Sequence, residues 1–424
     1  MTSFRFMHAA DIHLDSPLRG LTKQEGSAAE RVRTATRQAF ENLVGAAIEE
    51  EVAFLVVAGD LYDGDWRDYN TGLFFVAQMG RLADAGIPVF LLHGNHDAES
   101  QITRRLTLPD NVNVFSAKKP ETFELKESGV ALHGRSFKER AVTENLVPAY
   151  PEPVAGAFNI GVLHTGLGGM GGHADYAPCA LDDLVNKGYQ YWALGHVHKG
   201  DVLHERPHVV FPGNLQGRHI RETGPKGAQL VSVQDGEVAD LTLVVADVVR
   251  WASVAVAADG CDRVVDVADR IRDSIESAVA DEAEGRLLAC RIELTGRSEI
   301  HQTLLCSTDH LLAEARAVAA GLGEEVAWVE KVVVATEAAD DPQTILERKD
   351  ALGELQRMLQ DAHKDPELLE KLEADLGELV RKLPPDLRAE IDSGALLAAI
   401  KAEPPSLIDE VTPYLMARLT AEGA

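Results

Sequence analysis

The hydrophobic pattern of the first 245 residues alternates between short apolar runs and helical periods. Apolar runs of strand length occupy Phe4–Ala10, Phe54–Ala58, Val89–Leu92, Ile160–Leu163 and Tyr191–Leu194. Between them, residues 28–50 and 73–85 repeat apolar side chains at the spacing of an amphipathic helix. Such alternation predicts an α/β layered core. Further apolar runs at 209–211, 228–233 and 238–245 predict additional strands.

The pattern changes after residue 250. Strand-like runs at 251–257, 287–294 and 326–335 alternate with helical periods at 263–280 and 309–320, which predicts a small separate α/β domain. Beyond residue 338 the periodicity is helical. There Asp365-Pro366 predicts a helix start, because Asp caps helices and Pro suits the first helical position. We therefore predict three parts, residues 1–247, 248–338 and 339–424.

The composition is that of a globular protein without a membrane anchor. No apolar run reaches the 18 or so residues that a spanning helix needs. The amino terminus enters a strand-like run directly, without the pattern of a signal peptide. The four cysteines, expected as buried thiols, are scattered and form no CxxC pair, which is typical of a reducing compartment. We expect a cytoplasmic protein.

The net charge of −27 bears on the choice of substrate. Nucleic-acid-binding proteins usually present a basic face, because phosphate neutralisation supplies much of their affinity. Residues 1–245 hold 22 basic and 31 acidic residues, whereas the remainder holds 19 and 37. The excess acid is therefore concentrated outside the first part, where the candidate chemistry lies. The acidity still leaves a small phosphoester open as an alternative substrate.

Five short polar clusters each follow an apolar strand directly. They are Asp11-Ile12-His13, Gly59-Asp60, Gly94-Asn95-His96-Asp97, His164-Thr165 and Gly195-His196-Val197-His198. The carboxyl ends of neighbouring strands meet at one edge of a layered α/β fold, so these side chains are expected at one place. In extended backbone, alternate residues such as Asp11 and His13, or His196 and His198, would point the same way.

The residue types of these clusters indicate a metal site. Carboxylate and amide oxygens with imidazole nitrogens, and no thiolate, suit manganese, iron or zinc. A bridging carboxylate would hold two ions about 3.5–4 Å apart, and such a pair can clamp a phosphate and activate a water. Each cluster alone also has a structural interpretation, since Gly-Asp is a common turn or helix cap. Their joint occurrence in this order favours the metal site.

The order D-x-H, G-D, G-N-H-D, H and G-H-x-H resembles that of the calcineurin-like metallophosphoesterase superfamily. Within it, the chain resembles the SbcD-type DNA repair nucleases and, more narrowly, the YhaO-like exonuclease branch. The narrower resemblance rests on residues 8–17, 133–137 and 211–222, and it fades over 250–337. It implies a four-layer β-sandwich flanked by helices, with a small α/β capping domain and a helical C-terminal region.

The resemblance also implies roles for individual residues. One ion would be held by Asp11, His13, Asp60 and His198, and the other by Asp60, Asn95, His164 and His196. His96 would act beside the scissile phosphate as general acid or transition-state stabiliser, oriented by Asp97. Manganese is the expected metal. Some family nucleases carry a second His after Gly-Asp, where this chain has Asp63, so a DNA-guiding role of that position is in doubt.

The resulting expectation is a two-metal DNA nuclease, an exonuclease or single-strand endonuclease acting in repair. By analogy it would work as a homodimer with an SMC-like coiled-coil ATPase. The leucine stripes after residue 342, among them the one over 368–383, could bind that partner or pack on their own domain. Candidate DNA contacts, which could equally support the fold or lie on a solvated surface, are Arg135, Arg218, His219 and Arg221.

Two alternatives stay open. One is a phosphodiesterase or phosphatase of the same superfamily that acts on a small phosphoester. The other is a non-catalytic scaffold that holds a partner ATPase. A scaffold predicts a degenerate metal set, whereas all eight motif positions carry the expected residue types.

Overall fold

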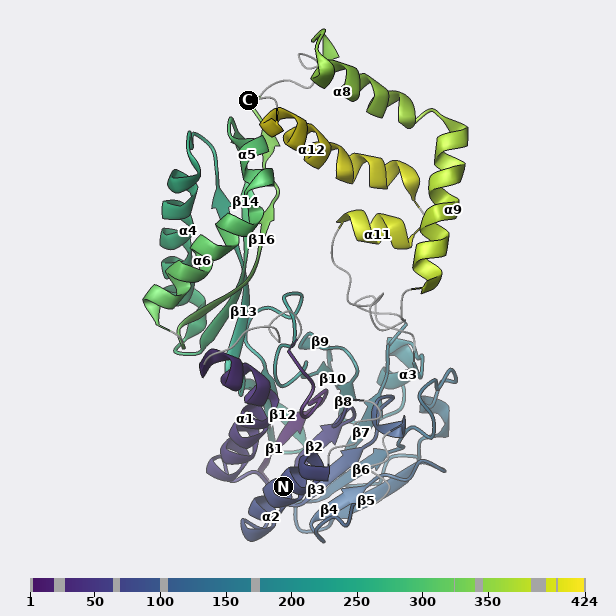
Figure 1. Ribbon diagram of the computed structural model, residues 1–424. Coiled ribbons are helices and arrows are strands. Elements are labelled where there is room, and N and C mark those ends of the chain that lie inside the picture. Colours follow the sequence, from purple (N-terminus) through teal and green to yellow (C-terminus); the bar gives the residue numbers. More distant parts are fainter. Residues whose placement is uncertain are drawn as a thin grey trace. The chain divides into compact units, whose positions relative to one another are not determined.

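The structure, a computed structural model, describes residues 3–18, 27–63, 69–99, 106–168, 176–323, 325–339, 346–382, 394–401 and 403–422 (Figure 1). The chain divides into two compact units. The first comprises Met1–Ala252, Asp281–Ala289 and Glu324–Val326, and the second comprises Ser253–Ala280, Cys290–Gly323 and Ala327–Ala424.

Two six-stranded mixed sheets form the first unit. The strands of one, in spatial order, are β12 (Glu237–Val245), β11 (Gly227–Gln234), β1 (Phe4–Ala9), β2 (Leu55–Ala58), β3 (Val89–Leu92) and β4 (Val112–Val114). Those of the other are β5 (Glu121–Leu125), β6 (Val130–Gly134), β7 (Phe158–His164), β8 (Tyr191–Gly195), β10 (His208–Phe211) and β9 (Asp201–Glu205). The central pairs β1–β2, β2–β3 and β7–β8 are parallel, so their carboxyl ends share an edge.

The two sheets pack face to face through a mainly apolar layer. Phe6 stacks on Phe54 with ring centroids 4.9 Å apart, and Phe6 also meets Tyr191 of the other sheet edge to face at 5.2 Å. β2, β3 and β8 are buried on both faces. This explains why the sequence shows continuous apolar runs at these strands and no alternation.

Helices cover the outer face of the first sheet. α1 (Ser27–Glu49) and α2 (Tyr69–Asp84) bury Phe40, Leu43 and Phe75 against it. The outer face of the second sheet is covered by loops, two 3-10 turns (Asp97–Glu99 and Val147–Ala149) and the short α3 (Leu181–Val185), around the buried Trp192. The predicted α/β class and layered sandwich are confirmed.

The second unit contains most of a three-stranded sheet in the order β13 (Val249–Ala257), β14 (Leu287–Thr295) and β16 (Ala327–Val334). Ala258 N–H donates to the Thr295 carbonyl, and Ala335 N–H to that of Leu294, so the strands run parallel. Further elements are α4 (Val264–Ala278), β15 (Arg297–Ser298), α5 (His301–Cys306), α6 (Thr308–Leu322) and β17 (Glu337–Ala338). The βαβαβ order predicted from the sequence is confirmed, except that α4 ends in a π-turn at Val279–Ala283.

The carboxyl-terminal part is helical, as predicted. Its helices are α8 (Ala351–Ala362), α9 (Pro366–Lys382), α11 (Gly394–Ile400) and α12 (Pro404–Glu422). Asp365 Oδ1 accepts the backbone N–H groups of Glu367 and Leu368, which confirms the predicted helix start. The boundaries at 247/248 and 338/339 remain a prediction.

Two features bear on the surroundings of the protein. In the described part of the chain, no helix combines the length and the apolar character needed to cross a membrane. All four cysteines are free thiols, and Cys179, Cys261 and Cys290 are buried. Cys306 is exposed, so the expectation of four buried thiols is wrong at that position, which lies at the end of α5.

Candidate metal centre

The eight motif residues lie where five strands end. β1 leads to Asp11 and His13, β2 to Asp60, β3 to Asn95 and His96, β7 ends on His164, and β8 leads to His196 and His198. Seven of the eight are buried or nearly so, and His96 is half-buried. The adjoining edges of both sheets therefore contribute to one site.

The backbone at this edge turns sharply. The φ angles of Asp11, His13 and Asp60 are 50°, 45° and 53°, and that of His196 is 100°. The extended backbone under which Asp11 and His13, or His196 and His198, would point the same way is therefore not present. The cause is visible in backbone hydrogen bonds, because Asp11 N–H donates to the Gly59 carbonyl and His13 N–H to that of Asp60. The turns aim the side chains inward in place of strand alternation.

Three overlapping groups of side chains can each hold a metal ion. In each group the ligand atoms lie within 4.8 Å of one another. The groups are Asp11, His13 and His198; Asp60, His164 and His196; and His13, Asp60 and His96. The first group contains three of the four residues predicted for one ion, without Asp60, and the second contains three of the four predicted for the other. His196 and His198 fall into different groups. The third group shows that the His96 ring faces the same space.

Glycine precedes three of the ligands because no side chain fits there. A Cβ at Gly94 would lie 2.3 Å from Asp60 Oδ1, and one at Gly59, where φ is +100°, would lie 2.4 Å from His164 Nδ1. Real Cβ atoms do not approach so closely. The glycines of the Gly-Asp and Gly-Asn motifs are therefore required by the packing of neighbouring ligands against the backbone.

The surroundings of His164 fit a metal ion. Its Nδ1 donates to the Ala58 carbonyl at 2.9 Å, which leaves Nε2 as the coordinating nitrogen. That Nε2 faces Asn95 Oδ1 at 2.9 Å and Asp60 Oδ2 at 3.3 Å. Three electron-rich atoms thus converge on one point. Burial opposes a charged ring, but the Asp60 carboxylate and its hydrogen bond raise the pKa of His164 to about 9. A cation is needed at this point, either a proton or a metal.

The surroundings of His13 lead to the same conclusion. Its Nε2 lies 3.2 Å from the Nε2 of His198, and its Nδ1 is buried without a hydrogen-bond partner among the described residues. Burial, with the nearby Arg218 cation, holds the pKa of His13 well below its ordinary value. Two imidazoles with facing nitrogens beside a buried carboxylate are a suitable ligand set for a divalent ion.

The two aspartates differ in charge state. Burial raises the pKa of Asp11 to about 7, although His164 and the N–H of His196 lower it. For Asp60, burial also opposes ionisation, but His164 and His96 hold its pKa below the ordinary range. Asp60 is thus the more strongly anionic of the two carboxylates. It belongs to groups on both sides of the site, as expected of a bridging ligand.

His96 pairs with Asp63, and the predicted orientation by Asp97 is wrong. His96 Nδ1 lies 2.8 Å from Asp63 Oδ1. The carboxylate of Asp97 turns to the backbone instead, and accepts the N–H groups of Leu61, Tyr62 and Gly94 at 3.2, 2.9 and 3.0 Å. Burial opposes the charged ring, but the Asp63 hydrogen bond and the Asp60 charge raise the pKa of His96.

A second residue missed by the sequence analysis is Glu222. Its Oε1 accepts from His198 Nδ1 at 2.6 Å, so His198 turns its other nitrogen to the site. Despite burial, that hydrogen bond holds the pKa of Glu222 below its ordinary range. Glu222 closes the 211–222 segment noted above, but only the fold brings it to His198. Asp63 was visible in the sequence as a departure from the family pattern.

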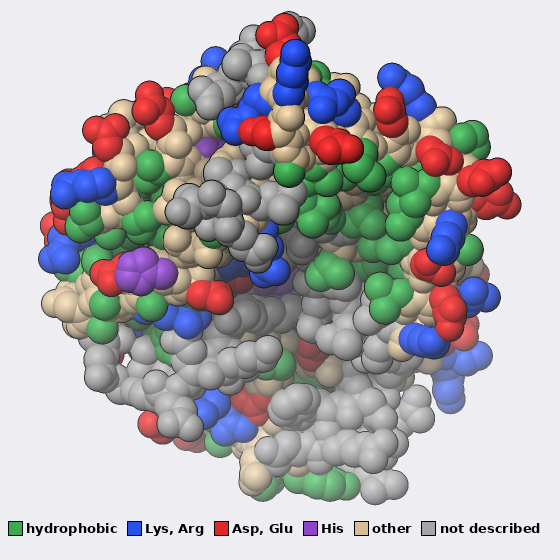
Figure 2. All heavy atoms as spheres, turned by 45° about the horizontal axis from the view of Figure 1, so that its top comes forward, with side chains coloured by type: hydrophobic (Ala, Val, Ile, Leu, Met, Phe, Trp, Pro, Cys, Tyr) green, Lys and Arg blue, Asp and Glu red, His purple; other side chains and the backbone are tan. Residues whose placement is uncertain are grey.

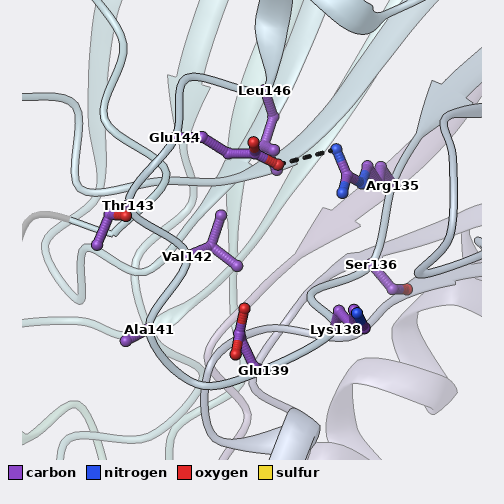
Figure 3. A pocket seen from close by; sticks show the side chains of 9 residues that line it. All are labelled: Arg135, Ser136, Lys138, Glu139, Ala141, Val142, Thr143, Glu144 and Leu146. Carbon is purple, nitrogen blue, oxygen red and sulfur yellow. Dashed lines mark ion pairs between the residues drawn. The ribbon is translucent and has the colours of Figure 1, made fainter.

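The candidate DNA contacts divide into buried and accessible groups. Arg218 is only 9% exposed, and its guanidinium bonds Ser16 and Asp63. Arg221 is exposed, and the half-buried His219 lies 3.3 Å from Glu222. Figure 3 shows Arg135 paired with Glu144 at 3.3 Å beside a cavity of about 270 Å³. No member of the three metal groups lines that cavity. DNA contact by all four remains a prediction.

Comparison with known families agrees with the fold and the site. Residues 4–200 match the family model described as Calcineurin-like phosphoesterase. Residues 251–337 match the model described as Metallophosphoesterase YhaO, middle domain. Residues 4–200 are therefore similar in sequence to the calcineurin-like phosphoesterases, and residues 251–337 to the middle domain of the YhaO metallophosphoesterases.

Individual relatives narrow the placement. Over 242 residues the chain is 40% identical to the "Uncharacterized metallophosphoesterase YhaO" of Bacillus subtilis, which covers 56% of this chain and 59% of that protein. It is also similar to two proteins named "DNA double-strand break repair protein Mre11". The identity is 26% over 231 residues for that of Methanopyrus kandleri, covering 50% of this chain and 48% of the relative. It is 27% over 212 residues for that of Sulfurisphaera tokodaii, covering 48% and 51%.

These matches span between about half and three fifths of the relatives' length. Among solved structures, a dimetal phosphatase from Danio rerio matches 55% of this chain and 94% of its own chain. Its sequence identity is 13% and the TM-score is 0.35.

Proposed function

We propose that this protein is a two-metal phosphodiesterase that hydrolyses DNA, as an exonuclease or a single-strand endonuclease. The observation that carries the hydrolytic proposal is the set of three ligand groups, in which Asp60 is grouped both with His164 and His196 and with His13 and His96. Seven side chains would hold two divalent ions, with Asp60 between them: Asp11, His13, Asp60, Asn95, His164, His196 and His198. Manganese is the proposed metal.

Bound ions would supply positive charge to the phosphate and lower the pKa of a water nucleophile. The chain's own residues supply the rest. Asp63 accepts a hydrogen bond from His96 Nδ1–H and thereby fixes the ring. Nε2 is then the nitrogen left to give a proton to the leaving oxygen. Because the carboxylates around His96 raise its pKa, the protonated form needed of a general acid is favoured.

DNA is favoured as substrate by the similarity to the two Mre11 proteins, whose name assigns them to double-strand break repair. The charge distribution permits it, since most of the excess acid lies beyond residue 245. A small phosphoester is the second candidate, and the net charge of −27 is the observation that favours it. A purely scaffolding role is disfavoured, because a scaffold does not need a complete ligand set.

Cleavage by purified protein with Mn²⁺ tests the proposal. End-labelled single- and double-stranded DNA should be degraded, and His96→Ala should lose about 10²–10⁴-fold in kcat while it retains its metal. An Arg140→Ala variant, changed outside the metal groups, serves as the matched control. Turnover of bis-p-nitrophenyl phosphate with DNA left intact would identify the small-ester alternative. Equal DNA cleavage by wild type and His96→Ala would overturn the role of His96.

The carboxyl-terminal helices are the proposed binding region for a coiled-coil ATPase. Described residues of α9 are nowhere fully buried, and Leu368 and Leu379 are 37% and 50% exposed. Figure 2 shows hydrophobic side chains gathered among acidic and basic ones on the face that it draws. Such amphipathic helices suit a helical partner. Binding to a purified ATPase of this class should be lost in a Leu368→Asp, Leu379→Asp variant that keeps its phosphoesterase activity. We also propose a homodimer, which sedimentation would test.

A further inference from the structure

Arg218 occupies an unusual position for a cation in a metal site. It is 9% exposed, and its Nη1 lies 3.1 Å from Ser16 Oγ and 3.4 Å from Asp63 Oδ2. Ser16 Oγ in turn donates to Asp63 Oδ2 at 2.7 Å. One oxygen of Asp63 therefore receives Ser16 and Arg218, while the other receives His96 at 2.8 Å.

The loop that carries Arg218 is held by several buried hydrogen bonds. The side chain of Gln216, in the same loop, forms hydrogen bonds with the backbone of Gly217, Val248 and Val249. The indole N–H of Trp251 also donates to the Gly217 carbonyl at 2.9 Å. A buried arginine on such a loop loses little conformational entropy when it binds a carboxylate. Arg218 can therefore hold Asp63 in one orientation.

We propose that Arg218 is a positioning residue for the general acid: with Ser16 it fixes Asp63, which fixes His96. Both oxygens of the Asp63 carboxylate are engaged, Oδ2 by Ser16 and Arg218 and Oδ1 by His96, which opposes its rotation. A neutral side chain at position 218 would leave one oxygen with Ser16 alone. Asp63 would then rotate, and His96 would lose its orientation toward the leaving oxygen.

The same loop separates two tasks. Arg218 N–H donates to Glu222 Oε2 at 2.6 Å, and Glu222 Oε1 holds His198, a proposed metal ligand. The side chain of Glu222 therefore serves the metal, whereas the side chain of Arg218 serves the acid. Substitutions at the two positions should produce different defects, which a general loosening of the loop would not.

This inference rests on the hydrolytic part of the proposed function and not on DNA as substrate. Its test uses two aryl methyl phosphodiesters, one with a p-nitrophenyl and one with a phenyl leaving group, beside DNA. The phenyl ester needs a proton on its leaving oxygen far more than the p-nitrophenyl ester does. Arg218→Gln should lower kcat at least about tenfold on the phenyl ester and on DNA, and about threefold or less on the p-nitrophenyl ester.

Three companion variants sharpen the result. Arg218→Lys should recover part of the lost kcat, because an ammonium can still reach Asp63. The His96→Ala, Arg218→Gln double variant should be no slower than His96→Ala alone, since both act through one ring. Glu222→Gln should lose about 10–100-fold in Mn²⁺ affinity, whereas Arg218→Gln should keep wild-type metal content. A crystal structure of Arg218→Gln should show Asp63 displaced from His96.

Several outcomes would overturn the inference. An equal slowing of both esters, or losses that add to those of His96→Ala, would indicate a merely structural role. A raised KM on DNA with unchanged kcat and a salt slope smaller by about one would identify Arg218 as a phosphate contact. That last behaviour is instead expected of the exposed Arg221→Gln, which is the matched control. If the wild type hydrolyses the esters but spares DNA, the nuclease proposal fails while the comparison of esters still decides this one.

Discussion

The chemistry of the site depends on atoms that the chain brings within van der Waals contact of one another. Gly94 is the clearest case, because it follows β3 and lies against both Asp60 and His164. A methyl group there has no space, whereas its absence lets Asp60 and His164 pack closely against the end of β3. Glycine at this edge therefore allows the proposed ligands to approach the backbone closely, in addition to permitting the turn.

Substitution of Gly94 should therefore disturb the metal centre selectively. Gly94→Ala would place Cβ at 2.3 Å from Asp60 Oδ1, so we expect at least about a tenfold loss of Mn²⁺ affinity, measured by calorimetry. Gly80→Ala in α2 is the matched control, since nothing lies within 4 Å of its added Cβ. It should stabilise the fold by about 0.5–1 kcal/mol. Unchanged metal binding in Gly94→Ala would refute the argument.

Sequence reasoning at the residue scale found ligand types but not their partners. The motifs predicted eight residues at one edge, and the structure brings their side chains together there. The partners of the histidines were not predictable from the sequence. Asp63 contacts His96, and Glu222 contacts His198, only because the fold brings separate loops together. Asp97, adjacent to His96 in sequence, was the natural choice and is wrong, since it accepts backbone N–H groups.

At the scale of elements, buried polar contacts of His8 join the two sheets within their apolar interface. His8 of β1 lies 3.0 Å from the hydroxyl of Tyr191 and 3.1 Å from the Leu194 carbonyl, both in β8. These contacts cross the interface between the sheets. The partner Leu194 precedes His196 by two residues in the sequence. Burial lowers the pKa of His8 to about 3, so the ring is neutral in the folded protein.

This buried histidine should make folding stability depend on pH. An unfolded histidine gains a proton near pH 6.5, whereas folded His8 does so only near pH 3. The unfolded chain therefore binds more protons between these values, and stability is lost as pH falls below about 6.5. The contribution of His8 approaches about 1.4 kcal/mol per pH unit.

Urea unfolding in a chelator at pH 7.5, 6 and 5 would measure this dependence. His8→Gln lowers the free energy of unfolding at pH 7.5 but should flatten its pH slope relative to wild type. The exposed His310→Gln is the control and should leave the slope unchanged. A His8→Gln slope equal to that of wild type would contradict the assignment.

Elements buried on both faces were the easiest to predict. β2, β3 and β8 read as continuous apolar runs, and the structure confirms them within one residue of their predicted ends. β4, β5 and β9 were not predicted, because they lie at sheet edges with half-exposed, mixed residues. β6 was also missed although it is buried, because its short run ends in His133 and Gly134. The left-handed turns at Asp11 and Asp60 also gave no sequence signal, since they arise from backbone contacts between strand ends.

At the scale of the whole molecule, the chemistry lies in the first unit and the strongest acidity beyond it. The three metal groups all belong to residues 1–252, and so do Glu222 and Arg218. The proposed partner helices belong to the second unit. This division predicts that helix variants affect assembly while the metal centre keeps its properties.

The number of metal ions in Asp60 variants tests the account most directly. Purified wild type, equilibrated with Mn²⁺ and freed of excess ion, should hold two ions per chain by elemental analysis. Asp60→Ala should lose both, because Asp60 belongs to groups on both sides of the site, whereas His96→Ala should keep two. An Asp60→Ala protein that retains two ions, or a wild type that binds none, would contradict the binuclear centre.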